Sequence, residues 1–549
     1  MPKVIDLLRQ GRYDELWQKC CGYLRLDIES FMSIQNRLMQ KQINLLERSP
    51  LGQKIFQGQH PRSVDEFRQI VPLTTYEEYC PELPEKMEER LPAKPSRWVH
   101  TSGRSGEYSC KWVPLTSEFV SELGSVICGI GLISGAREWG DTAPIIENPD
   151  IIYTVAPRPY ISGELAKILL DEMPSRYYPS LEESEEMPFE ERIKAGFSKA
   201  LDNGLDYFFG LSLVLSIVGD QFRESAVKID LVQLLGRPRA FWRVVGGILK
   251  ARLARRRILP SDLWQVKGII TSGLDSSVYR EKIKTLWGRY PLDIYACTEG
   301  SVIATQTWDY GSMTFIPHLN FLEFIPEKEY LKWQLDKRYQ PRTVLLNEVQ
   351  PGENYEIVIS NFHGGALVRY RIGDMIRITS LKNENLGIEI PQMVFARRAD
   401  DLLDFVVIRL TEKKIWEAIE NTGIPYRDWV AYKKPGEPIL NILLELNEGT
   451  DLKEKQVEMA IYEQIIRSEI DDYTTSRAHD DLTNMINFRV KVTLLPAGAF
   501  ARYISARRSE GADLAHLKPP HLNPPQKVLE RLLASTGISY SREEESRIV

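Results

Sequence analysis

Hydrophobic positions near the start of the chain recur at helical spacing. They are Phe31, Ile34, Leu38 and Leu45. This spacing puts them on one face of a helix, so we expect a long amphipathic helix from about Leu26 to Leu46. A second helix start follows at Thr75, because Glu78 stands three residues later and the pair has the pattern of a capping box.

Further along, helical patterns alternate with short runs rich in β-branched and aromatic residues. The runs are Ile151–Val155, Val266–Ile270, Leu292–Ala296 and Tyr355–Ser360. Alternation of this kind is typical of a layered α/β fold.

The pattern breaks at the polar stretch Leu381–Gly387 and the charged string Arg397–Asp401, and new helices and strands follow. We therefore expect two domains, residues 1–397 and residues 398–549. A proline-rich segment after Leu517 leads to an expected last helix at Val528–Ser535.

The length and composition of the chain fit a globular protein of two domains. A chain of 549 residues is too long for one core, and 43% hydrophobic and 27% charged residues are those of a globular protein. The net charge of −6 lacks the positive sign that is typical of nucleic-acid-binding proteins. The basic run Arg237–Arg257 is local, and we take Val244, Ile248 and Leu253 to mark one face of its helix. A solvated basic face is favoured over a membrane or RNA surface.

The six cysteines form no C-x-x-C pair, so reduced thiols are expected. The chain begins without an apolar segment, and the apolar runs Val126–Ile133 and Leu211–Val218 are shorter than the ~20 residues that span a bilayer. We therefore expect a cytoplasmic protein without a membrane partner.

A stretch rich in glycine and hydroxyl groups lies between the β-prone flanks Trp98–Val99 and Lys111–Val113. Its residues are Thr101, Ser102, Gly103, Arg104, Ser105 and Gly106. Backbone N–H groups of such loops can converge on phosphate because glycine has no Cβ in the way. The spacing fits neither a Walker loop nor G-x-G-x-x-G. We expect a loop between two strands, with Lys111 able to reach back toward a polyphosphate; a turn that binds nothing is the alternative.

Two more segments carry carboxylates suited to a nucleotide. Tyr295–Gly300 follows a predicted strand, where a carboxylate beside a hydroxyl suits Mg²⁺ and Tyr295 could stack on a base. In Arg369–Arg377 we expect two strands around a Gly-Asp turn, and Asp374 can accept hydrogen bonds from both ribose hydroxyls. A solvated glutamate and a plain hairpin are the alternative interpretations.

Four ordered segments resemble the motifs of the adenylate-forming superfamily, which includes acyl-CoA synthetases, peptide-synthetase adenylation domains and luciferases. They are Thr101–Lys111, Tyr295–Glu299, Tyr370–Asp374 and Arg398–Asp401. The likeness is greatest to the Gretchen Hagen (auxin-responsive promoter) family of acyl acid amido synthetases. Pro291–Gly300 and the ending Leu495–Phe500 with Gly511–Pro519 carry that branch's pattern.

The resemblance implies a large N-terminal multi-sheet α/β domain of the adenylate-forming type and a smaller mobile α+β C-terminal domain. It implies two steps with ATP and Mg²⁺. A carboxylate attacks the α-phosphate of ATP to give an acyl adenylate and pyrophosphate, and an amine, expected to be an amino acid, then displaces AMP. Such chemistry needs positioning and charge neutralisation more than a covalent nucleophile.

Roles at the phosphate end also follow from the resemblance. Thr101 to Gly106 would cradle the phosphates, Thr298 would contact the α-phosphate or the carboxylate, and Glu299 would bind Mg²⁺. This sequence has Arg104 where a hydroxyl is usual, and Lys111 comes slightly late, so Arg104 could meet the third phosphate instead of Lys111.

At the nucleoside end, the resemblance implies that Tyr295 stacks on adenine, Asp374 holds the ribose and Arg398 approaches it. Asp400 would mark the hinge of the small domain. The Gly-Lys pair that ends many relatives is absent, so Lys518 is the candidate for its catalytic charge, with a solvated lysine as the alternative.

The acyl pocket is less specified. Thr271–Asp275 could border it or form an ordinary turn, and Tyr153–Pro159 and Phe208–Val218 are candidate walls. The histidines are scattered without metal-ligand spacing: His60, His100, His318, His363, His479, His516 and His521.

Two alternative functions stay open at this point. A CoA thioester synthetase shares the first step and differs in the nucleophile. A catalytically idle sensor of a nucleotide or acid is suggested by Arg104, although the joint presence of Glu299, Asp374 and Arg398 favours an enzyme.

Overall fold

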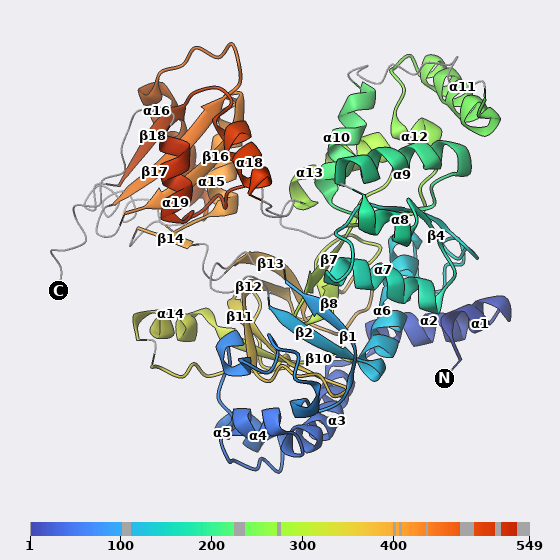
Figure 1. Cartoon of the computed structure of the whole chain (residues 1–549), viewed down its shortest axis with the longest axis vertical. Coiled ribbons are helices and arrows are strands. Elements are labelled where there is room, and N and C mark those ends of the chain that lie inside the picture. Colours follow the sequence, from blue (N-terminus) through green and yellow to red (C-terminus); the bar gives the residue numbers. More distant parts are fainter. Residues whose placement is uncertain are drawn as a thin grey trace. The chain divides into compact units, whose positions relative to one another are not determined.

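The computed structural model describes residues 2–101, 111–187, 189–223, 236–271, 276–336, 338–398, 402–405, 409–434, 438–472, 488–510 and 518–534. The chain forms two compact units, Met1–Ala396 and Arg397–Val549 (Figure 1).

Unit 1 is built on an eleven-stranded sheet with the order β10-β11-β12-β13-β9-β8-β7-β6-β5-β3-β4. Strands β4, β3, β5, β6 and β7 pair in parallel. From β7 onward the pairs β7–β8, β8–β9, β9–β13, β12–β11 and β11–β10 are antiparallel. The predicted layered α/β class is confirmed.

The strands of unit 1 are β1 (Pro95–His100), β2 (Trp112–Thr116), β3 (Asp150–Tyr153), β4 (Arg176–Tyr178), β5 (Tyr207–Gly210), β6 (Gly268–Thr271), β7 (Leu292–Cys297), β8 (Ser301–Thr305), β9 (Met313–Phe315), β10 (Asn320–Pro326), β11 (Asn354–Asn361), β12 (Tyr370–Ser380) and β13 (Gln392–Arg398). Its α-helices are α1 (Val4–Arg9), α2 (Tyr13–Cys21), α3 (Ile28–Glu47), α4 (Pro50–Phe56), α5 (Val64–Ile70), α6 (Ser117–Gly135), α7 (Ile161–Glu172), α8 (Leu181–Glu186), α9 (Phe189–Asn203), α10 (Ser212–Arg223), α11 (Pro238–Leu253), α12 (Pro260–Leu263), α13 (Ser276–Trp287) and α14 (Glu327–Leu335). Short 3₁₀ helices occupy Gly22–Arg25, Tyr76–Tyr79 and Glu88–Arg90.

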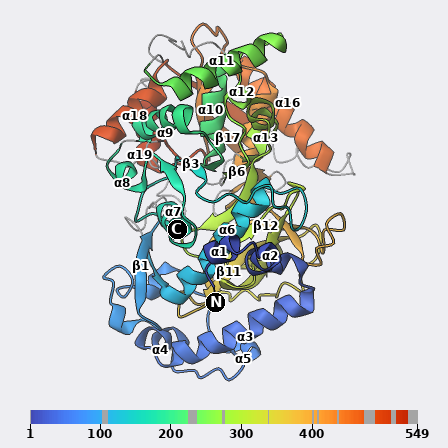
Figure 2. The same cartoon turned by 90° about the vertical axis from the view of Figure 1, so that its right-hand side faces the viewer.

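The parallel half of the sheet is covered on both faces. Side chains alternate along a strand, so Ile152 and Phe208 join one core with α9 to α13, while the neighbouring Ile151 and Tyr207 join another with α7 and α8. At the antiparallel half, α3 lies along the sheet (Figure 2), where Gln35 donates to the carbonyls of Pro317 and Asn320 at 2.6 and 2.8 Å.

The local sequence signals for helices are confirmed. The predicted helix at Leu26–Leu46 is α3, which begins after Asp27, whose carboxylate accepts from the backbone N–H of Ser30. The capping box of Thr75 and Glu78 is present and starts the 3₁₀ helix Tyr76–Tyr79.

Helix α6 has the length and apolar composition of a membrane span, but 61% of its most apolar window is buried in unit 1. It packs against α2, α7 and β6. It is therefore a core helix of this unit.

The basic run is helix α11, and the face predicted for it is wrong. Val244 is buried, whereas Leu253 is 85% exposed. At 100° per residue, a separation of nine residues is about half a turn out of phase, so the two side chains lie on opposite faces.

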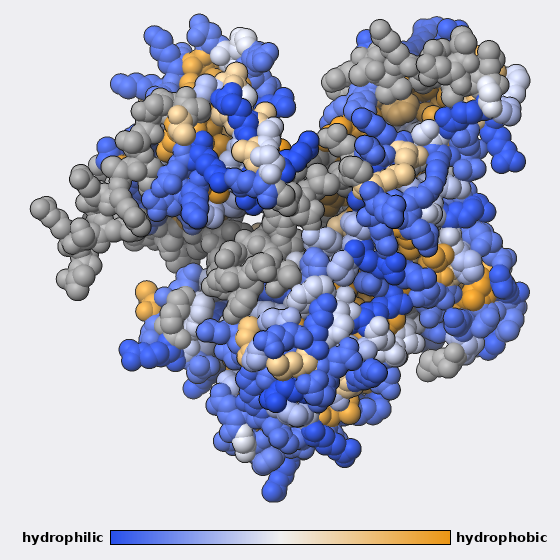
Figure 3. All heavy atoms as spheres, in the orientation of Figure 1, coloured by the Kyte–Doolittle hydropathy of each residue, from blue (hydrophilic) through white to orange (hydrophobic). Residues whose placement is uncertain are grey.

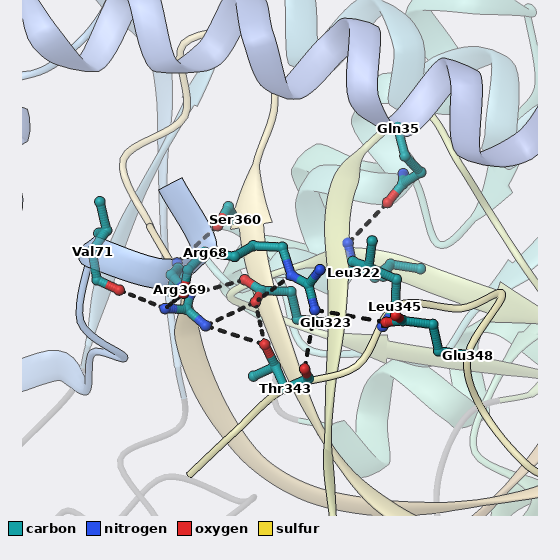
Figure 4. Close-up of polar contacts among 10 residues, drawn as sticks. All are labelled: Gln35, Arg68, Val71, Leu322, Glu323, Thr343, Leu345, Glu348, Ser360 and Arg369. Atoms are coloured by element: carbon teal, nitrogen blue, oxygen red, sulfur yellow. Dashed lines mark hydrogen bonds and ion pairs between the residues drawn. The ribbon is translucent and has the colours of Figure 1, made fainter. Parts of the chain in front are cut away.

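A buried ion pair fixes the antiparallel half of unit 1 (Figure 4). Arg369 Nε lies 3.1 Å from Glu323 Oε2 and Arg369 Nη2 lies 2.9 Å from Glu323 Oε1. The remaining guanidinium hydrogens go to the backbone carbonyls of Arg68 and Val71 and to the hydroxyl of Thr343. A buried charge needs this complete set of partners, because each missing one leaves a desolvated donor.

Hydrogen bonds also fix the backbone around Arg369. Its φ of +46° is left-handed, its N–H donates to Ser360 Oγ at 2.8 Å, and its carbonyl accepts from Thr74 N–H at 3.0 Å. Thr74 in turn accepts from the N–H of Arg371 at 2.9 Å. The start of β12 is thereby tied to the segment after α5.

Unit 2 is a three-stranded sheet, β16-β17-β18, flanked by helices. Its elements are β14 (Leu402–Asp404), β15 (Arg409–Thr411), α15 (Glu412–Asn421), β16 (Tyr426–Lys433), β17 (Ile439–Leu446), α16 (Glu454–Asp472), β18 (Arg489–Leu495), α18 (Ala499–Ser509) and α19 (Gln526–Leu533). Trp429 and Ala431 face α15 and α16, whereas Val430 and Tyr432 face α18 and α19. The predicted last helix is α19.

A charged cluster holds the segment before α19 on this sheet. His521 Nδ1 lies 2.7 Å from Glu412 Oε1 and its Nε2 lies 3.0 Å from Asp428 Oδ1, with the ring stacked on Trp429. Lys518 Nζ lies 3.4 Å from the other oxygen of Asp428. Burial lowers the pKa of His521, but the hydrogen bonds to Asp428 and Glu412 outweigh it and raise this pKa to about 9.

The ion pair of Arg369 gives a first prediction. Glu323→Gln removes the countercharge and should lower the free energy of unfolding of unit 1 by ~3–5 kcal/mol, because Arg369 stays buried and unpaired. Asp336→Asn is the same chemical change in an exposed ion pair with Arg338 and should cost at most ~0.5 kcal/mol. Urea unfolding of both variants checks this; equal costs would contradict it.

The pKa of His521 gives a second prediction. Because the folded pKa lies above the ordinary 6.5, protonated His521 stabilises unit 2 fully below pH 6.5, and this stability is lost as the pH rises through about 9. Urea unfolding of unit 2 should show the loss in the parent protein and a flatter pH profile in His521→Asn. His60→Asn, at an exposed histidine of unit 1, should keep the parent profile.

Candidate functional site

The first predicted motif is the connection of a hairpin. Strands β1 and β2 are antiparallel with His100 opposite Trp112. Thr101 N–H donates to Lys111 O at 3.0 Å, and Lys111 N–H donates to Thr101 Oγ1 at 3.0 Å. The predicted residues Ser102, Gly103, Arg104, Ser105 and Gly106 lie outside the described residues. The hairpin thus places Lys111 at the base of the loop.

The second motif is the tight turn between β7 and β8, which pair with Cys297 opposite Ser301. Gly300 N–H meets Cys297 Sγ at 3.2 Å. Asn361 donates to Glu299 O at 2.9 Å, and Asn320 donates to Gly300 O at 2.7 Å. Thr298 and Glu299 are half-buried at the tip of this turn.

Asn320 and Asn361 were missed by the sequence analysis. They lie on β10 and β11, are buried, and are linked by a hydrogen bond of 2.9 Å from Asn361 Nδ2 to Asn320 Oδ1. Both donate to backbone carbonyls of the turn, so they orient Glu299 through its main chain. No local motif marks such residues, because their partners lie in another part of the sequence.

The third motif is a single strand, and the predicted hairpin is wrong. β12 runs through Tyr370–Ser380 and pairs with β11 between Tyr370 and Arg377. The register shifts between the pairs Glu356–Met375 and Val358–Arg371, and Gly373 has a φ of +77° inside this irregularity. The glycine that suggested a turn in the sequence adopts its positive φ within a β-bulge, one residue before Asp374.

The three motifs meet at Tyr370. Lys111 Nζ lies 3.4 Å from Tyr370 Oη, which lies 3.5 Å from Glu299 Oε1. Burial, and after it the negative charge of Glu299, raises the pKa of Tyr370 well above its ordinary value. The phenol is therefore neutral, and it stands between a cation and a carboxylate. Tyr370 belongs to the motif Tyr370–Asp374, and the resemblance implies no role for it.

Asp374 and Tyr295 are also brought together. Tyr295 Oη donates to Asp374 Oδ2 at 2.8 Å, and both side chains are buried. The ring of Tyr295 lies beside Phe395 with centroids 6.0 Å apart. A carboxylate has further lone pairs, so Asp374 can accept from other hydroxyls while it keeps this bond.

The remaining predicted residues lie elsewhere in the chain. Arg398 ends β13, and its side chain is outside the described part, as is Asp400. Lys518 belongs to unit 2, where its side chain is 62% exposed beside Asp428. Within the described residues, no group of three or more His, Cys, Asp or Glu side chains could hold a metal ion.

An apolar cavity of about 80 Å³ lies on one face of the sheet of unit 1. Its walls come from α6, α7, the first two helices and strands β3 to β8, with Ala166, Phe209, Ile270, Ile294 and Val302 among them. Of the predicted pocket segments, Phe209 contributes, whereas Phe208 belongs to the core on the other face. Thr271 ends β6, and residues 272–275 lie outside the described part.

Part of the sequence is similar to proteins of known function. Residues 313–398 match the GH3 family central domain. The 4-substituted benzoates-glutamate ligase GH3.12 of Arabidopsis thaliana is 24% identical over 304 residues, which is 48% of this chain and 49% of that protein. The jasmonoyl–L-amino acid synthetase JAR4 of Nicotiana attenuata is 32% identical over 28% of this chain and 26% of its own. The matched part of this chain thus spans about half, or less, of these relatives.

Solved structures share the fold over nearly the whole chain. The acyl acid amido synthetase AtGH3.15 in complex with 2,4-DB aligns with a TM-score of 0.61 at 16% identity, covering 94% of this chain and 96% of that one. A 2-hydroxyisobutyryl-CoA ligase in complex with 2-HIB-AMP aligns with a TM-score of 0.57 at 14% identity, covering 93% and 94%. The chain is therefore similar to the GH3 family at residues 313–398, and its overall fold is that of these two ligases.

Proposed function

We propose that the chain is an ATP-dependent acyl acid amido synthetase. It would activate a carboxylic acid as an acyl adenylate and transfer the acyl group to an amine, with an amino acid as the expected acceptor. This proposal rests on one observation: three distant segments bring Lys111, Tyr370 and Glu299 together. Tyr370 Oη lies 3.4 Å from Lys111 Nζ and 3.5 Å from Glu299 Oε1.

The polar cluster suits the polyphosphate end of ATP. The Lys111 ammonium would neutralise phosphate charge next to the loop from Thr101 to Gly106, while the neutral Tyr370 phenol keeps Lys111 and Glu299 apart and oriented. Preorganised charge of this kind stabilises the transition state of phosphoryl transfer, because the polar groups of the site need not move during the reaction. Thr298 would donate its hydroxyl to the α-phosphate or the acid.

Mg²⁺ fits Glu299, because nucleotide-bound Mg²⁺ is commonly held by one or two carboxylates together with phosphate oxygens. When bound, the ion supplies charge neutralisation at the phosphates. The turn carbonyls held by Asn320 and Asn361 keep Glu299 in one place for that purpose.

The nucleoside would lie near Asp374. We infer that Tyr295 orients Asp374 through its hydrogen bond and offers its ring to adenine, while the Asp374 carboxylate accepts from the ribose hydroxyls. We also propose that Arg398 lies near the ribose, that Asp400 is the hinge and that Lys518 of unit 2 is the adenylation lysine. The proposed location is cytoplasmic.

The apolar cavity would take the organic part of the acid. Ile294, which lines the cavity, lies on strand β7, and this strand ends at Cys297 directly before the turn that carries Thr298 and Glu299. The relatives named above act, by their names, on benzoates and jasmonoyl groups, whose organic parts are apolar.

The test of the function is exchange of labelled pyrophosphate into ATP, run with a panel of aryl, indolyl and aliphatic acids. Acid-dependent exchange, followed by AMP release with amino acids, is the expected result. Release of AMP only with CoA would show a thioester synthetase, and no exchange with any acid would favour a sensor.

The metal role of Glu299 gives a third prediction. Glu299→Gln should lower pyrophosphate exchange by at least ~10²-fold, because a ligand of the charge-neutralising ion is lost. Glu384→Gln, at an exposed carboxylate in the same unit, should leave the rate unchanged. Near-normal exchange in the Glu299 variant would refute the assignment.

The cavity gives a fourth prediction. Ala166→Leu places a larger side chain in its wall and should raise KM for bulky apolar acids by ~10-fold, while the smallest active acid is nearly unaffected. Steady-state exchange with the same acids measures this. An equal loss for all acids would mean that the acid binds elsewhere.

A further inference from the structure

The outward face of α11 carries a row of large apolar side chains. Trp242, Leu249 and Leu253 are 69%, 55% and 85% exposed. At helical spacing they fall within about 40° of one another around the axis, with Gly246 in the gap between Trp242 and Leu249. The buried face lies opposite and consists of Ala240, Val244, Gly247 and Ala251. The exposed row, called the α11 stripe below, is therefore outside the core.

Basic residues border the α11 stripe on both sides. Arg237–Arg257 contains eight Lys or Arg and no Asp or Glu, in a chain whose net charge is −6. Arg239 and Lys250 project on one side of the stripe and Arg252 on the other, and all three are exposed. The local charge is thus opposite in sign to that of the molecule.

The basic residues divide into two groups by their contacts. Arg237 pairs with Asp202, Arg256 pairs with Asp262, and Arg243 donates to the carbonyl of Ala200 at 2.7 Å. These inward contacts fix α11 on α9 and α12. The outward group borders the stripe, so the helix is held rigidly with its apolar row and its charges facing away from the unit.

The shape and charge of this face decide between possible occupants. Most of the visible surface in Figure 3 is hydrophilic, with small apolar areas. A stable protein interface needs roughly 800 Å² on each partner, far more than three side chains supply. A lipid surface needs only a narrow row of Trp and Leu that enters the headgroup region, with Lys and Arg reaching the lipid phosphates beside it.

We propose that α11 docks the protein on the surface of an anionic lipid membrane. Trp242, Leu249 and Leu253 insert among the headgroups, and Arg239, Lys250 and Arg252 contact lipid phosphates. This surface is separate from the proposed reaction, so either can fail without the other. It replaces the solvated basic face expected from the sequence, because that expectation placed Leu253 on the buried side.

The test uses the full chain and vesicles of phosphatidylcholine, with and without phosphatidylglycerol, in a sedimentation assay. The protein should sediment with the anionic vesicles and be released as salt rises toward ~0.5 M, since screening weakens the phosphate contacts. Trp242→Ser combined with Leu253→Ser should weaken binding at least ~10-fold. Arg239→Glu combined with Lys250→Glu should weaken it similarly and remove the salt dependence.

Two matched controls separate this face from general surface effects. Leu335→Ser changes a leucine that is 90% exposed on α14, and Arg338→Glu reverses an exposed charge close to it. Both should bind vesicles like the parent protein. All the substituted side chains are exposed, and an unchanged unfolding transition shows that each variant is folded.

A second readout places Trp242 in the lipid. Brominated lipids should quench part of the tryptophan fluorescence of the parent protein, and this part should disappear in Trp242→Phe. The proposal is overturned if the protein does not bind anionic vesicles, or if the Trp242/Leu253 and Arg239/Lys250 variants bind them like the parent protein. It is also overturned if the α11 stripe instead joins two copies of the chain as a dimer in solution.

Discussion

The ion pair between Arg369 and Glu323 constrains the whole antiparallel half of unit 1. Two opposite charges buried together tolerate one arrangement, because a displaced guanidinium would lose carbonyl, hydroxyl and carboxylate partners at once. Arg369 directly precedes Tyr370 and lies five residues before Asp374. The register of β12, and with it the position of both site residues, is therefore set from a point outside the site.

The sequence predicts those features whose cause is local. Helix α3 and the capping box of Thr75 follow from spacing within a few residues, and the parallel strands follow from runs of apolar residues between helices. The four motifs also indicate the resemblance to a known family and the three segments that meet. Their likeness rests on residue identity, which a single sequence displays directly.

Features that depend on distant partners were missed or wrong. Asn320, Asn361 and Tyr370 gain their roles only when β10, β11 and β12 pair. The sequence around Gly373 predicts a turn where the structure has a bulge, since turns and bulges both use a glycine at positive φ and only the partner strand distinguishes them. The exposure of Leu253 has a local cause, because nine residues at 100° each place its side chain opposite that of Val244.

The hairpin of β1 and β2 ends in two hydrogen bonds that join Thr101 to Lys111. A closed base of this kind makes Lys111 independent of how many residues separate it from Thr101. Insertions or deletions inside the connection would then be tolerated without moving the ammonium group. The position of the Lys111 ammonium group is consequently set by the pairing of the two strands and not by the length of the connection.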